Sequence, residues 1–358
     1  MDNNDKIDFV LPWVDGGDPR WQAEYQQYSP GNALLNTQSR FTEWDNLQYL
    51  FRAFEESCSW VNKIYFITWG HLPSWLNTEH PKLVIVNHQD YLPSDALPVF
   101  SSHPIELNLH RIEGLSEKFV YFNDDCFILD KVKPTEFFKE QKPVDYGLLD
   151  VTHDGTISHI VLNNIDIINK HFNRHVAPEL AKSRVLTGNL KGWFSPKYGV
   201  ASLLQNLLLM KWKGHTGFVL NHHPQPLLKS TLEEVWKREP DALNKTTYSR
   251  FRDNQDVSQY LFRYWQLVSG KFSPGDYRQY QKQRKYVEVR TKADAERVAS
   301  DIHNKVYRML CINDAIFKGR YTKEDMSPAD FEHSKFAINQ ALATVYPDVS
   351  SFEKRPVK

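Results

Sequence analysis

Short apolar runs separated by polar segments are the clearest pattern in the first 125 positions. Four of these runs are rich in β-branched and aromatic residues and have the length of buried strands, at 8–14, 63–69, 82–87 and 118–124. Between them, apolar residues recur at helical spacing in two groups, which are Trp44, Leu47, Phe51 and Phe54, and Ile105, Leu109 and Ile112. Strands that alternate with helices predict an α/β fold with a largely parallel sheet, flanked by helices, whose ligand site lies beyond the carboxyl ends of the strands.

The pattern changes after position 150. From 151 to 220 it is irregular and mostly helical, and it contains the aromatic, basic stretches KGWFSPKYG and KWKGHTG. Further helices are predicted at 226–237 and 257–269, and further strands at 286–290 and 306–314. We therefore predict an α/β core at 1–150, an inserted and mostly helical region at 151–220, a helical segment at 221–304, and a return to the first sheet, with a C-terminal helix, at 305–358.

Charge and composition argue against several classes of protein, including nucleic-acid-binding, secreted and membrane-spanning proteins. Lys plus Arg (44) balance Asp plus Glu (44), so no overall field favours nucleic acid or an acidic membrane. The start, MDNNDKID, lacks the basic and apolar parts of a secretory signal, and no apolar run reaches the roughly 18 to 20 residues that cross a bilayer. Three scattered cysteines fit a reducing compartment and argue against a disulfide framework or a zinc site. We expect a soluble cytoplasmic protein whose basic ending, EKRPVK, permits a weak membrane contact.

Amide and carboxylate side chains follow two of the predicted strands directly. Asn123, Asp124 and Asp125 end the stretch FVYFNDD, and Asn313 and Asp314 end the similar stretch MLCIND. Such oxygen ligands suit Mg²⁺ or Mn²⁺, which often bridge carboxylates to the phosphates of a substrate. The alternative is an ordinary strand-to-turn junction, in which Asn and Asp bond the local backbone.

Two adjacent histidines precede a proline in LNHHPQP. His222 or His223 could act as a general base near neutral pH, but neighbouring histidines do not easily point at one target. A surface turn is the alternative.

Arginines and acids crowd the start of a predicted helix in YSRFRDNQDV. The Arg252 guanidinium suits a phosphate because it offers paired donors and stays charged. In the alternative, this is a solvated helix start in which Arg252 and acids such as Asp256 pair with each other.

The first strand runs into WVDGGDPRW. Its glycines permit a tight turn and the close approach of a ligand, and Trp13 could stack on a ring. Neither a GxxxxGK[ST] loop nor a GxGxxG fingerprint is present, and a polar loop is the alternative.

Taken together, these segments resemble the Stealth family of sugar-1-phosphate transferases. Four blocks occur in the family's order and cover roughly half of the chain: IDFVLPWVDGGDP, RFTEW through YFNDD, NHHPQPLLKS with RFRDNQDVS, and LCIND. The resemblance implies a Rossmann-like (GT-A-like) core at 1–150 that binds a nucleotide sugar. It also implies the transfer of a hexose-1-phosphate, expected to be an N-acetylhexosamine-1-phosphate, from a UDP-sugar to a hydroxyl of an oligosaccharide or polysaccharide acceptor. The products would be a phosphodiester and UMP, in capsule or exopolysaccharide synthesis.

The resemblance assigns roles position by position. Donor contacts are expected from Trp13, Val14, Asp15, Gly16, Arg40, Asn46, Thr68, Asn123 and Asn313. The ligands expected for the Mg²⁺ or Mn²⁺ cofactor are Asp124, Asp125 and Asp314. The expected catalytic residues are His222 as the base, Arg252 on the transferring phosphate, Asp256 orienting a neighbour, and Asp125.

Some features depart from the family pattern. The first block reads LPWVDG where many members have YTWVNG, so Asp15 carries a charge where an amide is common. Region 151–220 matches no block strongly and is expected to influence acceptor choice.

Two other functions stay open: a metal-dependent glycosyltransferase that releases UDP, and a non-catalytic glycan-binding protein. The oligomeric state is not predicted, and the expected place of work is the cytoplasm, at the inner face of the membrane.

Overall fold

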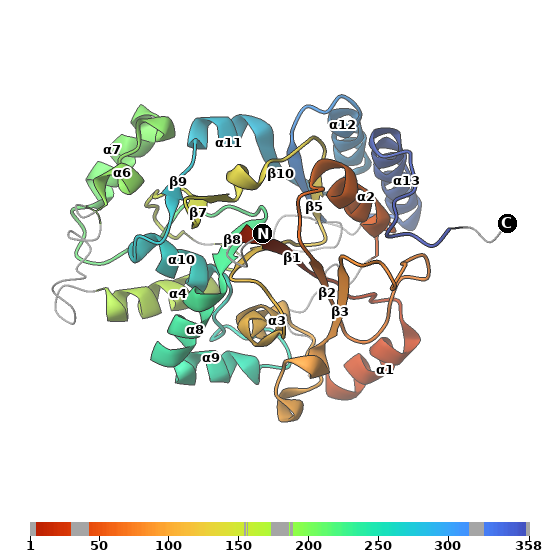
Figure 1. The fold of residues 1–358 in the computed structure, drawn as a ribbon, viewed down its shortest axis with the longest axis horizontal. Helices are drawn as coiled ribbons and strands as arrows, with labels where there is room; N and C mark the ends of the chain where they lie inside the picture. Colours follow the sequence, from red (N-terminus) through yellow and green to blue (C-terminus); the bar gives the residue numbers. More distant parts are fainter. Residues whose placement is uncertain are drawn as a thin grey trace.

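The computed structural model describes residues 5–29, 43–153, 155, 157–172, 186, 189–314 and 326–355, which form a mixed α/β fold (Figure 1). The main sheet has the strand order β3-β2-β1-β4-β8. These strands are Ile7–Pro12 (β1), Ile64–Thr68 (β2), Leu83–Asn87 (β3), Lys118–Tyr121 (β4) and Gln225–Leu228 (β8). The first four run parallel, whereas β8 is antiparallel to β4. The α/β class is therefore confirmed, the sheet is only partly parallel, and the Rossmann-like assignment stays a prediction.

Side chains of the central strands alternate between two hydrophobic cores, one on each face of the sheet. In β1, Phe9 and Leu11 belong to the first core and Val10 to the second. In β2, Phe66 and Ile67 divide in the same way. Because both faces are covered, these strands are apolar at nearly every position instead of at every second one. This pattern makes them recognisable in the sequence.

Helices cover both faces of the sheet (Figure 1). Helices that pack into the first core are Leu47–Ser57 (α2), Lys292–His303 (α12) and Pro328–Val345 (α13). Those in the second core are Ser102–Leu107 (α3), Ser158–His171 (α4), Lys229–Arg238 (α8), Pro240–Thr247 (α9) and Tyr260–Val268 (α10). Leu190–Trp193 (α6) and Val200–Leu209 (α7) add Trp193 and Leu209 to the second core, and the other described helices are Pro19–Tyr28 (α1) and Tyr277–Gln283 (α11). Among the described helices, none combines the length and the apolar character needed to cross a membrane.

Burial explains why α2 forms. This 11-residue helix would be marginal in isolation. Its buried face includes Leu50, Phe51 and Phe54, and each such side chain contributes roughly 1.5–3 kcal/mol when removed from water. The helix begins at Leu47, so our prediction that Trp44 lies on its face was wrong. Trp44 instead precedes the helix, half-buried, and its indole faces the site described below.

Two small sheets complete the fold. The first contains Arg284–Val289 (β10), Met309–Asp314 (β11) and Cys126–Ile128 (β5) in the order β10-β11-β5. The second contains Phe138–Lys139 (β6), Lys142–Asp145 (β7) and Ser273–Pro274 (β9). The prediction that the chain returns to the first sheet near its end was wrong, because β11 pairs with β5 in a separate sheet. Its side chains nevertheless join the same core as β1.

Other differences from the expected elements are local. The predicted helix at 226–237 starts later, at Lys229, because its first residues form β8 beside β4. The expected face with Ile105 is divided, since α3 ends at Leu107 and a separate 3₁₀ turn covers Leu109–Arg111. Region 151–220 holds α4, α6 and α7, so its helical character is confirmed for the part that the structure describes. The boundaries between the four proposed segments stay a prediction.

Candidate active site

The segments that follow β4 and end β11 lie side by side at the edge of the main sheet. β4 ends at Tyr121 and is followed by the NDD stretch, and the short strand β5 then begins at Cys126. The Ile312 amide donates to the Asp125 carbonyl at 2.9 Å, which fixes the end of β11 beside this stretch. Two clusters of polar residues that are far apart in the sequence are therefore brought together.

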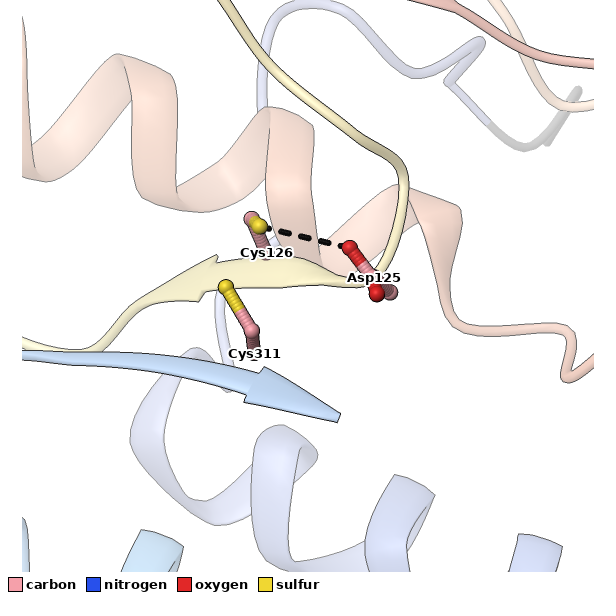
Figure 2. Close-up of side chains that lie close together, drawn as sticks. All are labelled: Asp125, Cys126 and Cys311. Carbon is pink, nitrogen blue, oxygen red and sulfur yellow. Dashed lines mark hydrogen bonds between the residues drawn. The ribbon is translucent and has the colours of Figure 1, made fainter. Parts of the chain in front are cut away.

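Asp125 is held by three neighbours. His222 Nε2 lies 3.3 Å from its Oδ2, Cys126 Sγ donates to its Oδ1 at 3.2 Å (Figure 2), and the Asn313 side chain favours its charged form. Burial alone would raise the pKa of this carboxyl group, but His222, Cys126 and Asn313 hold the pKa below its ordinary value of 3.8. Asp125 is therefore a carboxylate at neutral pH.

Asp124 has the opposite electrostatic environment. Asp124 is exposed to solvent, but it lies within reach of other carboxylates. Desolvation, together with the carboxylates of Asp125, Glu43 and Asp314, raises the pKa of Asp124 to about 8. Desolvation and nearby acids also raise the pKa of Glu43. The four acids therefore repel one another, and a cation between them would relieve that repulsion.

Two indole groups hold members of this acidic cluster in place. Trp13 Nε1 donates to Glu43 Oε2 at 3.0 Å, and Trp44 Nε1 donates to Asp314 Oδ2 at 3.1 Å. The clustered carboxylate oxygens are the donor set that Mg²⁺ and Mn²⁺ prefer. Glu43, Asp124, Asp125 and Asp314 supply such oxygens, although no three of these four described carboxylates place oxygens within 4.8 Å of one another in the structure.

Sulfur ligands also lie near Asp125. One ligand atom each from Asp125, Cys126 and Cys311 falls within 4.8 Å of the others (Figure 2). Burial raises the pKa of both thiols, so they stay protonated, whereas a metal binds the thiolate. We interpret these two cysteines as small apolar residues of the β5–β11 pair that support Asp125.

The structure separates the roles of the two histidines. The His222 side chain is 36% exposed, its Nε2 faces Asp125, and its ring packs edge-on to Tyr286 at 5.2 Å. Desolvation lowers the pKa of His222, but the Asp125 carboxylate outweighs it and raises the pKa above 6.5. His223 is buried, its Nδ1 lies 2.7 Å from the Tyr280 hydroxyl, and burial lowers its pKa to about 3. Only His222 therefore faces the acidic cluster.

Asp256 shapes the loop that carries Arg252. It is almost fully buried, and its Oδ2 accepts from the Asp253 amide at 3.0 Å and lies 2.9 Å from His103 Nδ1. Arg252 Nη2 donates to Ser102 Oγ at 3.0 Å. Burial lowers the pKa of Arg252, but an arginine remains charged at neutral pH. Asp256 is thus placed to position Arg252, while the Arg252 charge is felt at His222.

The loop after β1 is built from its own hydrogen bonds. The Asp15 amide donates to His71 Nε2 and the Asp15 carboxylate accepts from the Gly17 amide, both at 2.7 Å. The Gly16 carbonyl accepts from Gln22 Nε2 at 2.8 Å, and Val14 is half-buried between Trp13 and this turn. Trp13 is 9% exposed and stacks on Phe66, so its ring lies in the wall of the site.

The remaining predicted donor contacts differ in accessibility. Thr68 is fully buried and its hydroxyl donates to the His71 carbonyl at 2.6 Å, so it shapes the loop after β2. Asn46 immediately precedes α2, and Asn123 precedes Asp124; both are half-buried. Arg40 lies outside the described residues.

Sequence reasoning missed four neighbours of the site. Glu43 and Tyr286 are described above, and His71 accepts from Asp15. Glu106 is buried and accepts from the Tyr121 hydroxyl at 3.0 Å, and its charge contributes to the raised pKa of His222. An acid among the apolar residues of HPIELNL was a usable signal for Glu106, because buried carboxylates are rare unless paired.

Comparison with known proteins finds three matches to sequence models of Stealth protein conserved regions. Conserved region 1 matches residues 5–33, conserved region 2 matches 40–145, and conserved region 3 matches 221–265. The NDD stretch lies in the second of these regions, and His222 and Arg252 lie in the third.

The chain is also similar to named enzymes along almost its whole length. It is 38% identical to the capsular polysaccharide phosphotransferase WcwK of Streptococcus pneumoniae, over 99% of this chain and 100% of that protein. It is 36% identical to the receptor polysaccharide phosphotransferase WefC of Streptococcus oralis, over 97% and 99%. It is 33% identical to the exopolysaccharide phosphotransferase cps2G of Lactiplantibacillus plantarum, over 97% and 96%.

Proposed function

Because this chain belongs to the Stealth family, we propose that it is a phosphotransferase of capsule or exopolysaccharide synthesis. The relatives that align with nearly the whole chain are phosphotransferases of capsular, receptor and exopolysaccharides. The single observation that carries the proposal is the contact between His222 and Asp125 beside a cluster of carboxylates. This contact combines a base with a cation-binding surface, and phosphoryl transfer to a hydroxyl needs both.

The reaction that we propose uses a UDP-sugar as donor and a glycan hydroxyl as acceptor. The acceptor oxygen attacks the phosphorus that carries the hexose, which we expect to be an N-acetylhexosamine. The bond from that phosphorus to the bridging oxygen breaks, UMP leaves, and a phosphodiester remains. The sugar's anomeric bond stays intact throughout.

His222 is the residue that accepts the proton of the attacking hydroxyl in this scheme. Its ring is partly exposed and therefore accessible to an acceptor. The Asp125 carboxylate orients the ring and stabilises the imidazolium that forms, as its effect on the pKa of His222 indicates. Arg252 offsets negative charge on the transferring phosphate, and Asp256 positions it through the loop at 252–256.

The acidic cluster is the proposed site of a divalent cation. Asp124, Asp125 and Asp314, together with Glu43, would hold Mg²⁺ or Mn²⁺. When bound, this ion supplies positive charge that neutralises the diphosphate of the donor. We further propose that the enzyme works in the cytoplasm at the inner face of the membrane, where donor and growing glycan meet.

The identity of the nucleotide product tests the proposal. Purified chain is incubated with Mg²⁺ or Mn²⁺, a panel of UDP-sugars and short capsule-type oligosaccharides, and the nucleotide and glycan products are identified. Stoichiometric UMP with a phosphodiester in the glycan is the expected result. UDP as the stoichiometric product would establish a glycosyltransferase instead, and acceptor binding without turnover for any donor would establish a glycan-binding protein.

A further inference from the structure

Helix α7 buries Leu209 but carries four of its apolar side chains on the outside of the molecule. Val200, Leu204, Leu207 and Leu208 recur at the spacing of one helical face and are 75, 55, 52 and 61% exposed. A surface helix of a globular protein normally presents polar residues to solvent. In α7, apolar side chains instead face solvent, so this face of the helix is suited to contact with another apolar surface.

The inner face of α7 is secured by a polar residue. Asn206 is 1% exposed, its amide donates to the carbonyls of Gly147 and Trp193 at 2.7 Å each, and its Oδ1 accepts from the Leu149 amide at 2.8 Å. These bonds satisfy the buried amide and fix the rotation of the helix about its axis. The hydrogen bonds of Asn206 therefore hold the leucines of the opposite face toward the outside of the molecule.

Lysines precede and follow α7 along the chain. Lys191, Lys197, Lys211 and Lys213 are exposed, and residues 189–220 contain no Asp or Glu. Within the part of the chain that the structure describes, none of these lysines has a carboxylate at ion-pair distance. Trp212, between the last two lysines, is 59% exposed. An apolar stripe, an indole and several lysines are the combination that binds the interface of an anionic membrane.

A shallow recess widens the apolar surface. It has a volume of about 450 Å³ and is lined by the apolar residues Val151, Ala201, Leu204, Leu208 and Leu209 together with the polar residues Asp150 and Gln205. Helix α7, which supplies Ala201, Leu204, Leu208 and Leu209 to the recess, lies at the upper left of Figure 1, away from α12 and α13 at the upper right. Because these residues are separate from the acidic cluster, the surface needs an explanation of its own.

We propose that α7 and its flanking lysines form a docking surface for an anionic lipid bilayer. Leu204 and Leu208 enter the boundary between headgroups and acyl chains, and Lys211 and Lys213 meet the headgroup phosphates. A protein partner fits less well, because lysine is depleted from protein interfaces whereas it is enriched beside membrane-binding apolar faces. The inference goes beyond the proposed reaction and does not depend on it.

Flotation with lipid vesicles tests this surface on the full chain. The vesicles contain either phosphatidylcholine alone or phosphatidylcholine with one quarter phosphatidylglycerol. The wild-type chain is expected to float with the anionic vesicles and to be released by high salt. Leu204→Ser/Leu208→Ser should lower the partition coefficient by about tenfold or more. Lys211→Gln/Lys213→Gln should lower binding to the anionic vesicles severalfold.

Matched variants lie on the other side of the molecule. Phe336→Ser removes a 64% exposed side chain from α13, and Lys292→Gln removes an exposed charge from the start of α12; both should float like the wild type. The proposal is overturned if the wild type does not bind anionic vesicles, or if Leu204→Ser/Leu208→Ser binds as well as the wild type does. It is also overturned if light scattering shows a wild-type dimer that this double variant converts to a monomer, since the face would then bind a second copy.

Activity on a soluble acceptor separates this proposal from the proposed function. The α7 variants should release UMP from a UDP-sugar at the wild-type rate when the acceptor is a short oligosaccharide. If neither the wild type nor the variants show enzymatic activity, the vesicle result still stands, because flotation measures membrane binding alone. Circular dichroism of each variant shows whether it is folded.

Discussion

His222 Nε2 and Asp125 Oδ2 lie 3.3 Å apart, although the two residues are separated by 97 positions in the sequence. The sheet register explains this contact. β8 runs antiparallel to β4, and Gln225 pairs with Tyr121. Residues just before Gln225 and just after Tyr121 must therefore emerge at the same end of the strand pair. The hydrogen bonds of the sheet thus bring the proposed base to the carboxylate that orients it.

His222→Ala should reduce kcat by about 10²- to 10⁴-fold, since this is the usual contribution of a general base. The KM for the UDP-sugar should change little, because the donor is held mainly by other groups in our scheme. UMP release at varied donor and acceptor concentrations measures both parameters. His223→Gln is the matched control: His223 contacts Tyr280 and should retain most of the activity. Near-normal turnover of folded His222→Ala would remove this residue as the base.

Removal of an acid from the cluster should weaken metal-supported catalysis. Asp124→Asn and Asp314→Asn are each expected to raise the Mn²⁺ concentration for half-maximal activity by about tenfold or more, because each loses a proposed ligand. A chelator should abolish activity and added Mg²⁺ or Mn²⁺ should restore it. Asp166→Asn, in an exposed position on α4, is the control for loss of one negative charge. An unchanged metal requirement in both cluster variants would place the ion elsewhere.

The sequence predicts the central strands well because both faces of the sheet are covered and the strands are apolar throughout. It predicts β8 poorly. Pro226 and the following residues resemble a helix start, but the antiparallel partner β4 makes them a strand, and a proline is tolerated there because β8 is an edge strand. The pairing of β11 with β5 is equally hidden, because β5 has only three residues.

Some residues of the candidate site can be predicted from the sequence, and others cannot. Asp124, Asp125 and Asp314 stand at strand ends, where a local pattern points to a ligand site. Glu43 has no such signal, since only the tertiary fold brings it to Trp13 and to the acidic cluster. Trp13 was expected to be available for stacking on a ring, but it is buried against Phe66, because the core takes up the aromatic surface next to β1.

Arg252→Lys should lower kcat/KM by about 10- to 100-fold. A lysine keeps the charge but loses the paired donors that match a phosphate. The control is Arg250→Lys, two positions earlier, where the guanidinium donates to the carbonyls of Leu97 and Pro98. This second change should lower the Tm more than it lowers kcat/KM. Equal losses of activity in the two variants would mean that Arg252 only supports the loop.

Glu353 should make the stability of the protein depend on pH. Its two carboxylate oxygens accept from Arg52 Nε and Nη2 at 2.7 and 2.8 Å, which ties the C-terminal segment to α2. Burial opposes ionisation, but the bonds from Arg52 outweigh it and lower the pKa of Glu353 below its ordinary value of 4.5. A lowered pKa in the folded state means that this stabilisation is present above about pH 4.5 and is lost as the pH falls through the folded-state value.

Glu353→Gln should therefore lower the free energy of unfolding by about 2–3 kcal/mol at pH 7, since it leaves a half-buried guanidinium without its charged partner. The difference from the wild type should shrink as the pH falls below 4.5, because the carboxyl group of the unfolded wild-type chain takes up a proton there, and it should vanish below the lower pKa of the folded state. Urea denaturation at pH 7 and at pH 3.5 measures both values. Glu296→Gln is the control, because its pair with His333 is exposed and should be worth less than about 1 kcal/mol. A difference between Glu353→Gln and wild type that is equal at the two pH values would show that shape, and not charge, is what Arg52 recognises.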